Sequence, residues 1–300
     1  MEPFRLVCTL AILVLEMVAE PRPVMSDADV QKCKFRSLYN FGDSNSDTGG
    51  ISAALSEVTE PNGETFFGHP AGRFCDGRLL IDFLVETLKL PYLSPYLDSI
   101  GTNFKHGANF ATGGSSIRPG GYSPFHLGIQ IAQFIRFKAR ITSLYESGNS
   151  QALFKNNLPR PEDFSRALYT FDMGQNDLAY GFQLTTEQQV INSIPDILTQ
   201  FSQALHELYK EGARFFWVHN TGPIGCLPYS VIYNSKPRNK DKNGCVKSQN
   251  KVAQEFNKQL KDKISQLSRE LHHSTFTYVD VYSAKYHLIS TANTQGNIIL

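Results

Sequence analysis

Short apolar runs alternate along the chain with longer segments in which apolar residues recur every three or four positions. The short runs lie near residues 38–41, 108–111, 167–171, 214–218 and 276–279. Each run is bounded by Gly, Asn or Asp, which is typical of buried parallel strands. The helical period is clearest over 191–208, which stops before Gly212, and over 252–271. This alternation predicts a single doubly wound α/β domain, with helices on both faces of a parallel sheet.

Composition supports a globular enzyme and argues against large charged partners. The 300 residues are 41% hydrophobic and 19% charged, which is enough to bury a full core in one domain. The 29 basic and 28 acidic residues nearly cancel, so no charge excess favours nucleic acid or an anionic membrane. We therefore expect a small-molecule substrate. The sequence does not predict the oligomeric state.

The amino terminus has the pattern of a secretory signal peptide. Arg5 precedes an apolar stretch over 6–15, and Ala19 and a polar segment with two prolines follow. Ten apolar residues are too few to span a bilayer comfortably, although a buried core helix is the alternative. We expect residues 1–26 to be removed, with cleavage after Ala19 or after Ser26. Residues 27–300 would then form the secreted domain.

The cysteines agree with an oxidising compartment. Without the signal peptide the chain keeps Cys33, Cys75, Cys226 and Cys245, an even number that allows three pairings. We favour a Cys226–Cys245 disulfide, because these two residues flank a loop rich in Pro, Asn and Lys. Cys33 and Cys75 pair with each other, or one of them has a partner elsewhere. Metal-ligand spacings such as Cys-x-x-Cys are missing from the sequence, so no metal or cofactor is expected.

The segment after the first predicted strand carries the candidate nucleophile. It reads Phe-Gly-Asp-Ser-Asn-Ser-Asp-Thr-Gly-Gly over 41–50, and its serine is Ser44. A strand that ends here would hold the Ser44 hydroxyl at the carboxyl edge of the sheet, where open α/β folds place their chemistry. An ordinary strand-to-helix turn, capped by Asp47 or Thr48, is the alternative interpretation.

Two later segments favour catalysis. Residues 109–116 and 170–178 each place glycine and an amide side chain after an apolar run. They supply a backbone N–H and a side-chain amide that can donate to a developing oxyanion during acyl transfer. Asp43 and Asp47 would instead suggest a glycosidase pair. We expect Asp47 to cap a helix and Asp43 to accept hydrogen bonds within its loop.

The order of the three segments resembles that of the motifs in the SGNH or GDSL-type hydrolases. Their residues are most similar to those of the plant esterase/lipase branch that includes the early-nodulin esterases. The resemblance spans about residues 37–290. It implies a flavodoxin-like α/β/α sandwich with a five-stranded parallel sheet. It also implies that Ser44 is the nucleophile, that Gly114 (or its neighbour Gly113) is the backbone oxyanion donor, and that Asn176 is the side-chain donor. The expected substrate is a carboxylic ester of a lipid, carbohydrate or secondary metabolite. Hydrolysis through an acyl-serine would take place in the cell wall or apoplast.

The family's acid–base motif is missing from this sequence. Family members carry an Asp-x-x-His near the carboxyl end, and here no aspartate has a histidine three residues on. The chain therefore resembles a carboxyl-truncated member, and a non-catalytic ester-binding protein is the alternative function. The histidines are expected to have structural or surface roles: His69, His106, His126, His206, His219, His272, His273 and His287. Residues 115–128 form either a substrate-facing loop or an ordinary surface excursion.

Overall fold

The computed structural model describes residues 34–147, 155–234 and 237–292. Its centre is a five-stranded sheet in the order β2-β1-β3-β4-β5, and all four strand pairings are parallel. The strands are β1 Leu38–Gly42, β2 Gly107–Asn109, β3 Leu168–Asp172, β4 Phe215–His219 and β5 Thr275–Val279. The predicted α/β class and the flavodoxin-like strand order are confirmed. In this order the chain reverses direction across the sheet between β1 and β3, and ligands bind at the carboxyl ends of strands at such a point.

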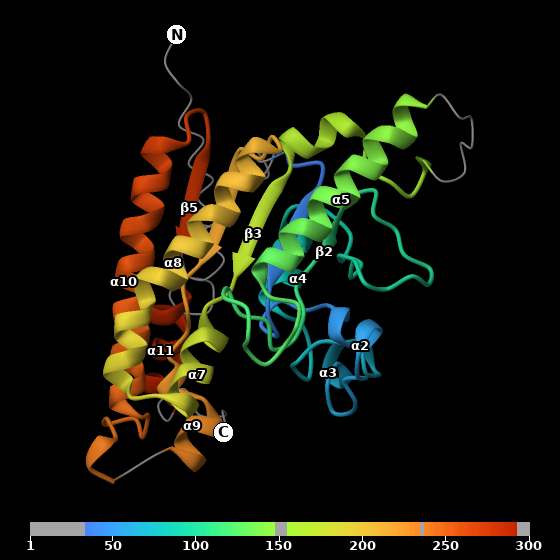
Figure 1. Cartoon of the computed structure of the whole chain (residues 1–300). Helices are drawn as coiled ribbons and strands as arrows, with labels where there is room; N and C mark the ends of the chain where they lie inside the picture. The colour runs from blue at the N-terminus through green and yellow to red at the C-terminus, as the bar shows by residue number, and fades with distance from the viewer. Residues whose placement is uncertain (1–33, 148–154, 235–236, 293–300) are drawn as a thin grey trace, which may run out of the picture.

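Helices flank the sheet and form its connections (Figure 1). The α-helices are α2 Gly50–Ala54, α3 Glu64–Phe67, α4 Leu80–Thr87, α5 Leu127–Glu146, α7 Gln175–Leu184, α8 Glu187–Lys210, α9 Pro228–Tyr233, α10 Lys247–Glu270 and α11 Val281–Thr291. Short 3-10 turns are η2 Pro161–Arg166, η3 Ile224–Cys226 and η4 Pro237–Asn239. The two helices with the clearest sequence period are α8 and α10. Thr186 caps α8 by accepting a hydrogen bond from the backbone N–H of Gln189.

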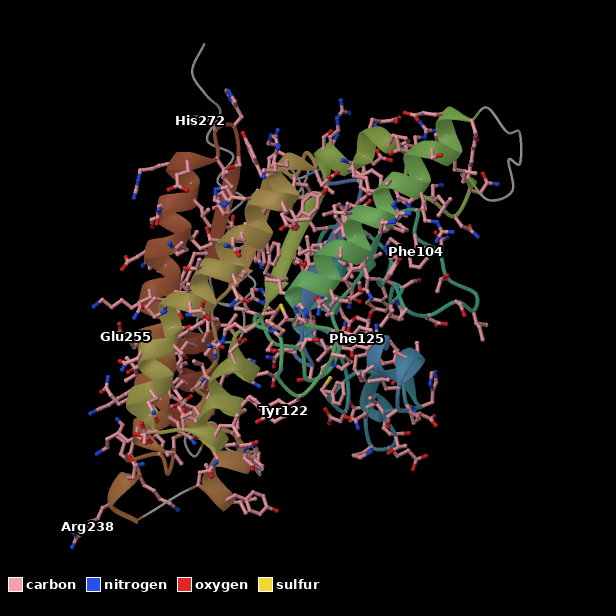
Figure 2. The ribbon with its side chains drawn as sticks, in the orientation of Figure 1. Phe104, Tyr122, Phe125, Arg238, Glu255 and His272 are labelled. Atoms are coloured by element: carbon pink, nitrogen blue, oxygen red, sulfur yellow. A yellow bond between two sulfur atoms is a disulfide. The ribbon has the colours of Figure 1, made fainter. Side chains whose placement is uncertain are left out.

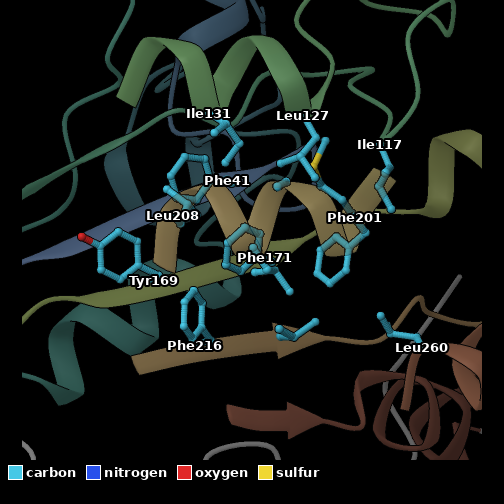
Figure 3. Close-up of a cluster of buried hydrophobic side chains, with 14 of the residues drawn as sticks. Phe41, Ile117, Leu127, Ile131, Tyr169, Phe171, Phe201, Leu208, Phe216 and Leu260 are labelled. Atoms are coloured by element: carbon cyan, nitrogen blue, oxygen red, sulfur yellow. The ribbon is translucent and has the colours of Figure 1, made fainter. Parts of the chain in front are cut away.

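One face of the sheet carries the main hydrophobic core, to which α5, α8 and α10 contribute (Figure 3). Three phenylalanine rings cross this core in a stack. The Phe41 ring centroid lies 5.3 Å from that of Phe110 and 5.2 Å from that of Phe171, with the planes within 16° of parallel. Each of these residues immediately precedes one of the polar loops at the carboxyl edge. The stack therefore fixes the spacing of the three loops.

The second face packs against α4. Leu38, Leu168 and Trp217 point to this side and join apolar residues of α4, such as Leu84. Strand β2 is shorter than predicted, because it ends at Asn109. The Asn109 side chain accepts the N–H of Ala111 at 3.0 Å and so turns the backbone out of the strand.

The favoured disulfide is present, with the Cα atoms of Cys226 and Cys245 4.3 Å apart. Cys75 is unpaired within the described residues, and Cys33 lies outside them. The predicted signal peptide also lies outside the described residues. Among the helices that are described, none is long and apolar enough to cross a membrane.

Candidate active site

Ser44 lies in the loop between β1 and α2, at the carboxyl edge of the sheet. The Asp43 N–H donates to the Asp172 carbonyl at 3.2 Å, so the pairing of β1 with β3 continues to the residue before Ser44. The Ser46 N–H then donates to the Asp43 carbonyl at 3.1 Å and closes a turn around Ser44. Ser44 is partly exposed, and its hydroxyl makes no hydrogen bond within the described part of the chain. The serine is thus held by its backbone and not by its side chain.

Asp47 ties this loop to the second polar segment. Its carboxylate accepts hydrogen bonds from the backbone N–H groups of Gly49, Gly50 and Ile51 at the start of α2. It also accepts the Gly113 N–H at 2.7 Å. The expected capping role of Asp47 is confirmed, because a carboxylate satisfies the free N–H groups at a helix start. The contact with Gly113 was not predicted.

The two candidate backbone donors are in different situations. The N–H of Gly113 is committed to Asp47, whereas the N–H of Gly114 has no partner among the described residues. Gly114 is partly exposed and has φ = 78°, a conformation that side chains other than that of glycine rarely adopt. An N–H that is free at the edge of the sheet is available to a ligand.

Asn176 lies in the first turn of α7, after β3, and its side chain is buried. The amide nitrogen Nδ2 donates to the Ser115 carbonyl at 2.8 Å and to Asp43 Oδ2 at 3.3 Å. The second of these bonds is long, so this hydrogen is the one that a stronger acceptor can take. The amide therefore bridges the loops that carry Ser44 and Gly114.

Asp43 connects the nucleophile loop with that amide. Its Oδ1 accepts the Asn45 N–H at 2.9 Å, while Oδ2 faces Asn176. The expected role of Asp43 as a loop acceptor is confirmed. Burial and the nearby carboxylate of Asp172 raise the pKa of Asp43 well above its ordinary value.

Asp177 holds the loop that follows Gly114. Its carboxylate accepts the N–H of Ile117 at 2.7 Å and the N–H of Arg118 at 3.0 Å. Burial raises the pKa of Asp177 to about 6. Residues 115–118 are therefore anchored next to Asn176 and do not form a free surface excursion.

A buried Asp–His pair lies behind the site, and the sequence did not predict it. His219, at the end of β4, has Nδ1 2.9 Å from Asp172 Oδ2, and its Nε2 accepts the Trp217 indole N–H at 2.8 Å. An indole only donates, so Nε2 accepts and the ring proton is on Nδ1, where Asp172 accepts it. Both ring nitrogens are thus used. These contacts support the predicted structural role of His219. The sequence could not reveal the pair, because Asp172 and His219 are far apart in the chain and meet only where β3 and β4 pair.

Two other groups considered from the sequence, His287 and a metal site, are not among these contacts. His287 is exposed on α11, with no hydrogen bond to the Ser44 hydroxyl. A search of the described residues for three or more His, Cys, Asp or Glu side chains able to hold a metal found no such group.

The five-stranded parallel sheet, with these groups at its carboxyl edge, matches the α/β/α sandwich of the SGNH hydrolase class. The sequence profile of the GDSL-like Lipase/Acylhydrolase family matches residues 38–297. The chain belongs to this family and is a carboxylic ester hydrolase, as predicted.

Plant relatives agree with this assignment over most of the chain. A GDSL esterase/lipase of Arabidopsis thaliana is 58% identical over 294 residues, which cover 97% of this chain and 77% of the relative. Alpha-L-fucosidase 3 of the same plant is 49% identical over 274 residues, 88% of this chain and 73% of the relative. The GDSL esterase/lipase ENOD8 of Medicago truncatula is 42% identical over 293 residues, 95% of this chain and 74% of the relative. The resemblance to the early-nodulin branch is thus confirmed.

Proposed function

We propose that this esterase acts through Ser44, with the N–H of Gly114 and the amide of Asn176 as oxyanion donors. The observation that carries the proposal is the convergence of three loops at one edge of the sheet. The Asn176 amide bridges two of them through Asp43 and the Ser115 carbonyl. The free N–H of Gly114 favours it over Gly113 as the backbone donor.

The reaction follows from this geometry in two steps. Ser44 Oγ attacks the ester carbonyl carbon while a general base takes its proton, and the carbonyl oxygen becomes an oxyanion that accepts hydrogen bonds from Gly114 and Asn176. The carbonyl then re-forms, the C–O bond to the alcohol breaks, and the alcohol leaves with the proton that the base took from Ser44. Water then attacks the acyl-serine, releases the acid and restores the Ser44 hydroxyl. Transfer of the acyl group to another alcohol would use the same residues.

The general base that receives the Ser44 proton is not His219, although His219 is buried near the site. His219 does not suit this role, because its Nε2 lone pair already accepts the Trp217 N–H. A protein that binds esters without turnover is the alternative left open by the missing Asp-x-x-His. Neither the relatives nor the contacts at Ser44 favour that alternative.

The substrate is proposed to be an ester of a small molecule, with lipid, carbohydrate and secondary-metabolite alcohols as the candidates. One relative is named a fucosidase, which raises the question of glycosidase chemistry. That chemistry needs two carboxylates facing a glycosidic bond. Here Asp47 is occupied by four backbone N–H groups, and Asp43 accepts from Asn45 and Asn176. The contacts therefore favour ester hydrolysis.

We also propose that the protein is secreted to the plant cell wall or apoplast. The charged, apolar and polar order of residues 1–26 supports this location, as does the Cys226–Cys245 disulfide. A fluorescent protein fused after residue 30 should appear in the medium of plant cells. Retention inside the cells would contradict secretion, and a fusion that lacks residues 1–26 is the control.

Covalent labelling tests the nucleophile. A fluorophosphonate reacts with activated serines, and mass spectrometry identifies the modified peptide. We expect label on Ser44 in the wild-type chain and none in Ser44→Ala. Label on another serine, or undiminished p-nitrophenyl acetate hydrolysis by Ser44→Ala, would overturn the assignment.

A further inference from the structure

Four tyrosines form a continuous strip beside the proposed oxyanion donors. The rings of Tyr122 and Tyr180 meet edge to face with centroids 5.1 Å apart, and those of Tyr229 and Tyr233 are also 5.1 Å apart. Gln183 on α7 joins the two pairs, because its amide donates to the Tyr229 hydroxyl at 3.4 Å. These residues come from the 115–128 loop, α7 and α9. We call the four residues the tyrosine strip.

The strip begins at the two proposed oxyanion donors. A Cβ atom placed on Gly114 would lie 3.2 Å from the Cβ of Tyr122. Tyr180 lies four residues after Asn176 in α7, so the two side chains share a face of that helix. Figure 2 shows Tyr122 at the edge of the molecule toward which the strands point. A group bound on the strip would therefore be directed toward the reacting carbonyl.

The strip is largely exposed, and each of its rings carries a hydroxyl group. The exposed fraction is 46% for Tyr122, 54% for Tyr229 and 73% for Tyr233. Exposed aromatic residues that cluster next to a site mark a binding surface more often than scattered ones do. Each ring offers an apolar face and a hydroxyl that donates and accepts.

A hollow of about 380 Å³ adjoins the strip at Tyr180, which forms part of its lining. It lies between the 116–121 segment and the helices α7 and α8. Its walls include Ser116, Arg118, Gln189 and Ser193, together with Asp177 next to Asn176. The volume is within the range of small-molecule sites, and the lining combines apolar surface with polar side chains.

We propose that the tyrosine strip and this hollow bind the alcohol half of the substrate, and that this half is an uncharged carbohydrate. The proposal rests on the proposed ester hydrolysis at Ser44 and names the substrate class. A sugar ring presents flat C–H faces that pack on an aromatic ring and hydroxyls around its rim. The strip offers faces in a row, with hydroxyls and amides at their edges, which matches that pattern along several sugar units.

The strip is less suited to a lipid. A long acyl chain gains most from an enclosed apolar cavity, because transfer from water scales with the apolar area that is covered. Docking to an anionic lipid surface usually adds several Lys or Arg around the apolar residues. The hollow beside the strip is lined by one arginine, Arg118, and it is paired with Asp177 and Asp196. Exposed Leu184 and Ile232 flank the tyrosines, so vesicle binding is included in the test.

The test measures binding without catalysis. Ser44→Ala protein is titrated by calorimetry with xylotetraose and cellotetraose, which contain no ester bond. We expect at least one of the two oligosaccharides to bind. Replacing Tyr229 and Tyr233 together by Ala should weaken this binding about tenfold or more, which corresponds to about 1.4 kcal/mol. Tyr229→Phe keeps the ring and should lose less. Phe83→Ala removes an exposed aromatic side chain on α4, outside the strip, and should leave the oligosaccharide affinity unchanged.

Three results would overturn the proposal. The first is that neither oligosaccharide binds. The second is that the tyrosine variants bind the oligosaccharides as tightly as the protein with the tyrosines intact. The third is that the protein binds phosphatidylcholine vesicles through the strip and does not bind the oligosaccharides. Thermal melting of each variant shows that the fold is kept. Hydrolysis of p-nitrophenyl acetate by the chain with Ser44 intact is measured separately. Failure of that reaction with oligosaccharide binding preserved would count against the proposed function and not against the strip.

Discussion

The proposed reaction centre around Ser44 and the tyrosine strip lie side by side but are built in opposite ways. In the centre, carboxylates of Asp43, Asp47 and Asp177 are buried and accept hydrogen bonds from three different loops. In the strip, rings of Tyr229 and Tyr233 are mostly exposed and touch mainly each other. Buried, fully used polar groups resist rearrangement, whereas exposed side chains adapt. The difference indicates a fixed centre with an adaptable rim, and the predictions below separate the two.

The largest effect is expected at the nucleophile. Ser44→Ala should remove ester hydrolysis, with a loss on the order of 10⁶ in kcat where the catalytic set is complete, because no other hydroxyl occupies that place. Ser46→Ala is the matched control, since Ser46 is buried two residues away and should retain activity. Steady-state hydrolysis of p-nitrophenyl acetate measures both. Comparable losses in the two variants would mean that the loop fold matters and not the Ser44 hydroxyl.

Stability should distinguish the core beneath the centre from the rim. Phe41→Ala removes the middle ring of the phenylalanine stack and should lower the free energy of unfolding by about 3–5 kcal/mol. Tyr233→Ala should change it by less than about 0.5 kcal/mol, because that ring is exposed. Denaturant titration followed by circular dichroism gives both values. A large loss in Tyr233→Ala would show that the strip is part of the core.

The oxyanion amide should affect the rate more than the fold. Asn176→Ala is expected to lower kcat by about 10²–10³, roughly 2.7–4 kcal/mol, because the amide stabilises charge that develops only during the reaction. Gln175→Ala, one residue earlier in α7, is the control and should leave kcat within a few-fold. Kinetics and thermal melts are measured together. An Asn176→Ala protein that melts early and keeps its kcat would assign the amide a purely structural role.

The smallest effect concerns pH. The pKa of Asp177 is raised from 3.8 to about 6 by burial, so between these values the folded chain holds a proton that the unfolded chain has released. The free energy of unfolding that depends on Asp177 is therefore highest below pH 4 and falls as the pH rises from 4 to 6. The total decrease over this interval is a few kcal/mol at most. Asp177→Asn should remove this slope, as measured by urea unfolding at pH 4.5 and pH 7. Asp196→Asn, an exposed carboxylate that pairs with Arg118, should keep it.

Sequence reasoning recovered the parts of the molecule that are local in the chain. Strands appear as short apolar runs, and Ser44, Gly114 and Asn176 each follow one, so a motif of a few residues is enough to propose them as site residues. It named Gly114 as the proposed backbone donor on resemblance alone, with Gly113 as the alternative. It could not predict that the Gly113 N–H is bound by Asp47, because Asp47 belongs to another loop. The Asp172–His219 pair and the tyrosine strip were missed for the same reason. Their members are far apart in sequence, and only the sheet and the packing of α7 against its neighbours bring them together.

The phenylalanine stack has a consequence for motion. Because Phe41, Phe110 and Phe171 are in face-to-face contact at the ends of neighbouring strands, a displacement of one strand end is shared by the other two. The three loops should therefore fluctuate as one body, and the distances among their reactive groups should persist while the whole domain vibrates. Heating would then leave the Arrhenius plot of ester hydrolysis straight until the core itself melts, without an earlier break from loosening of a single loop.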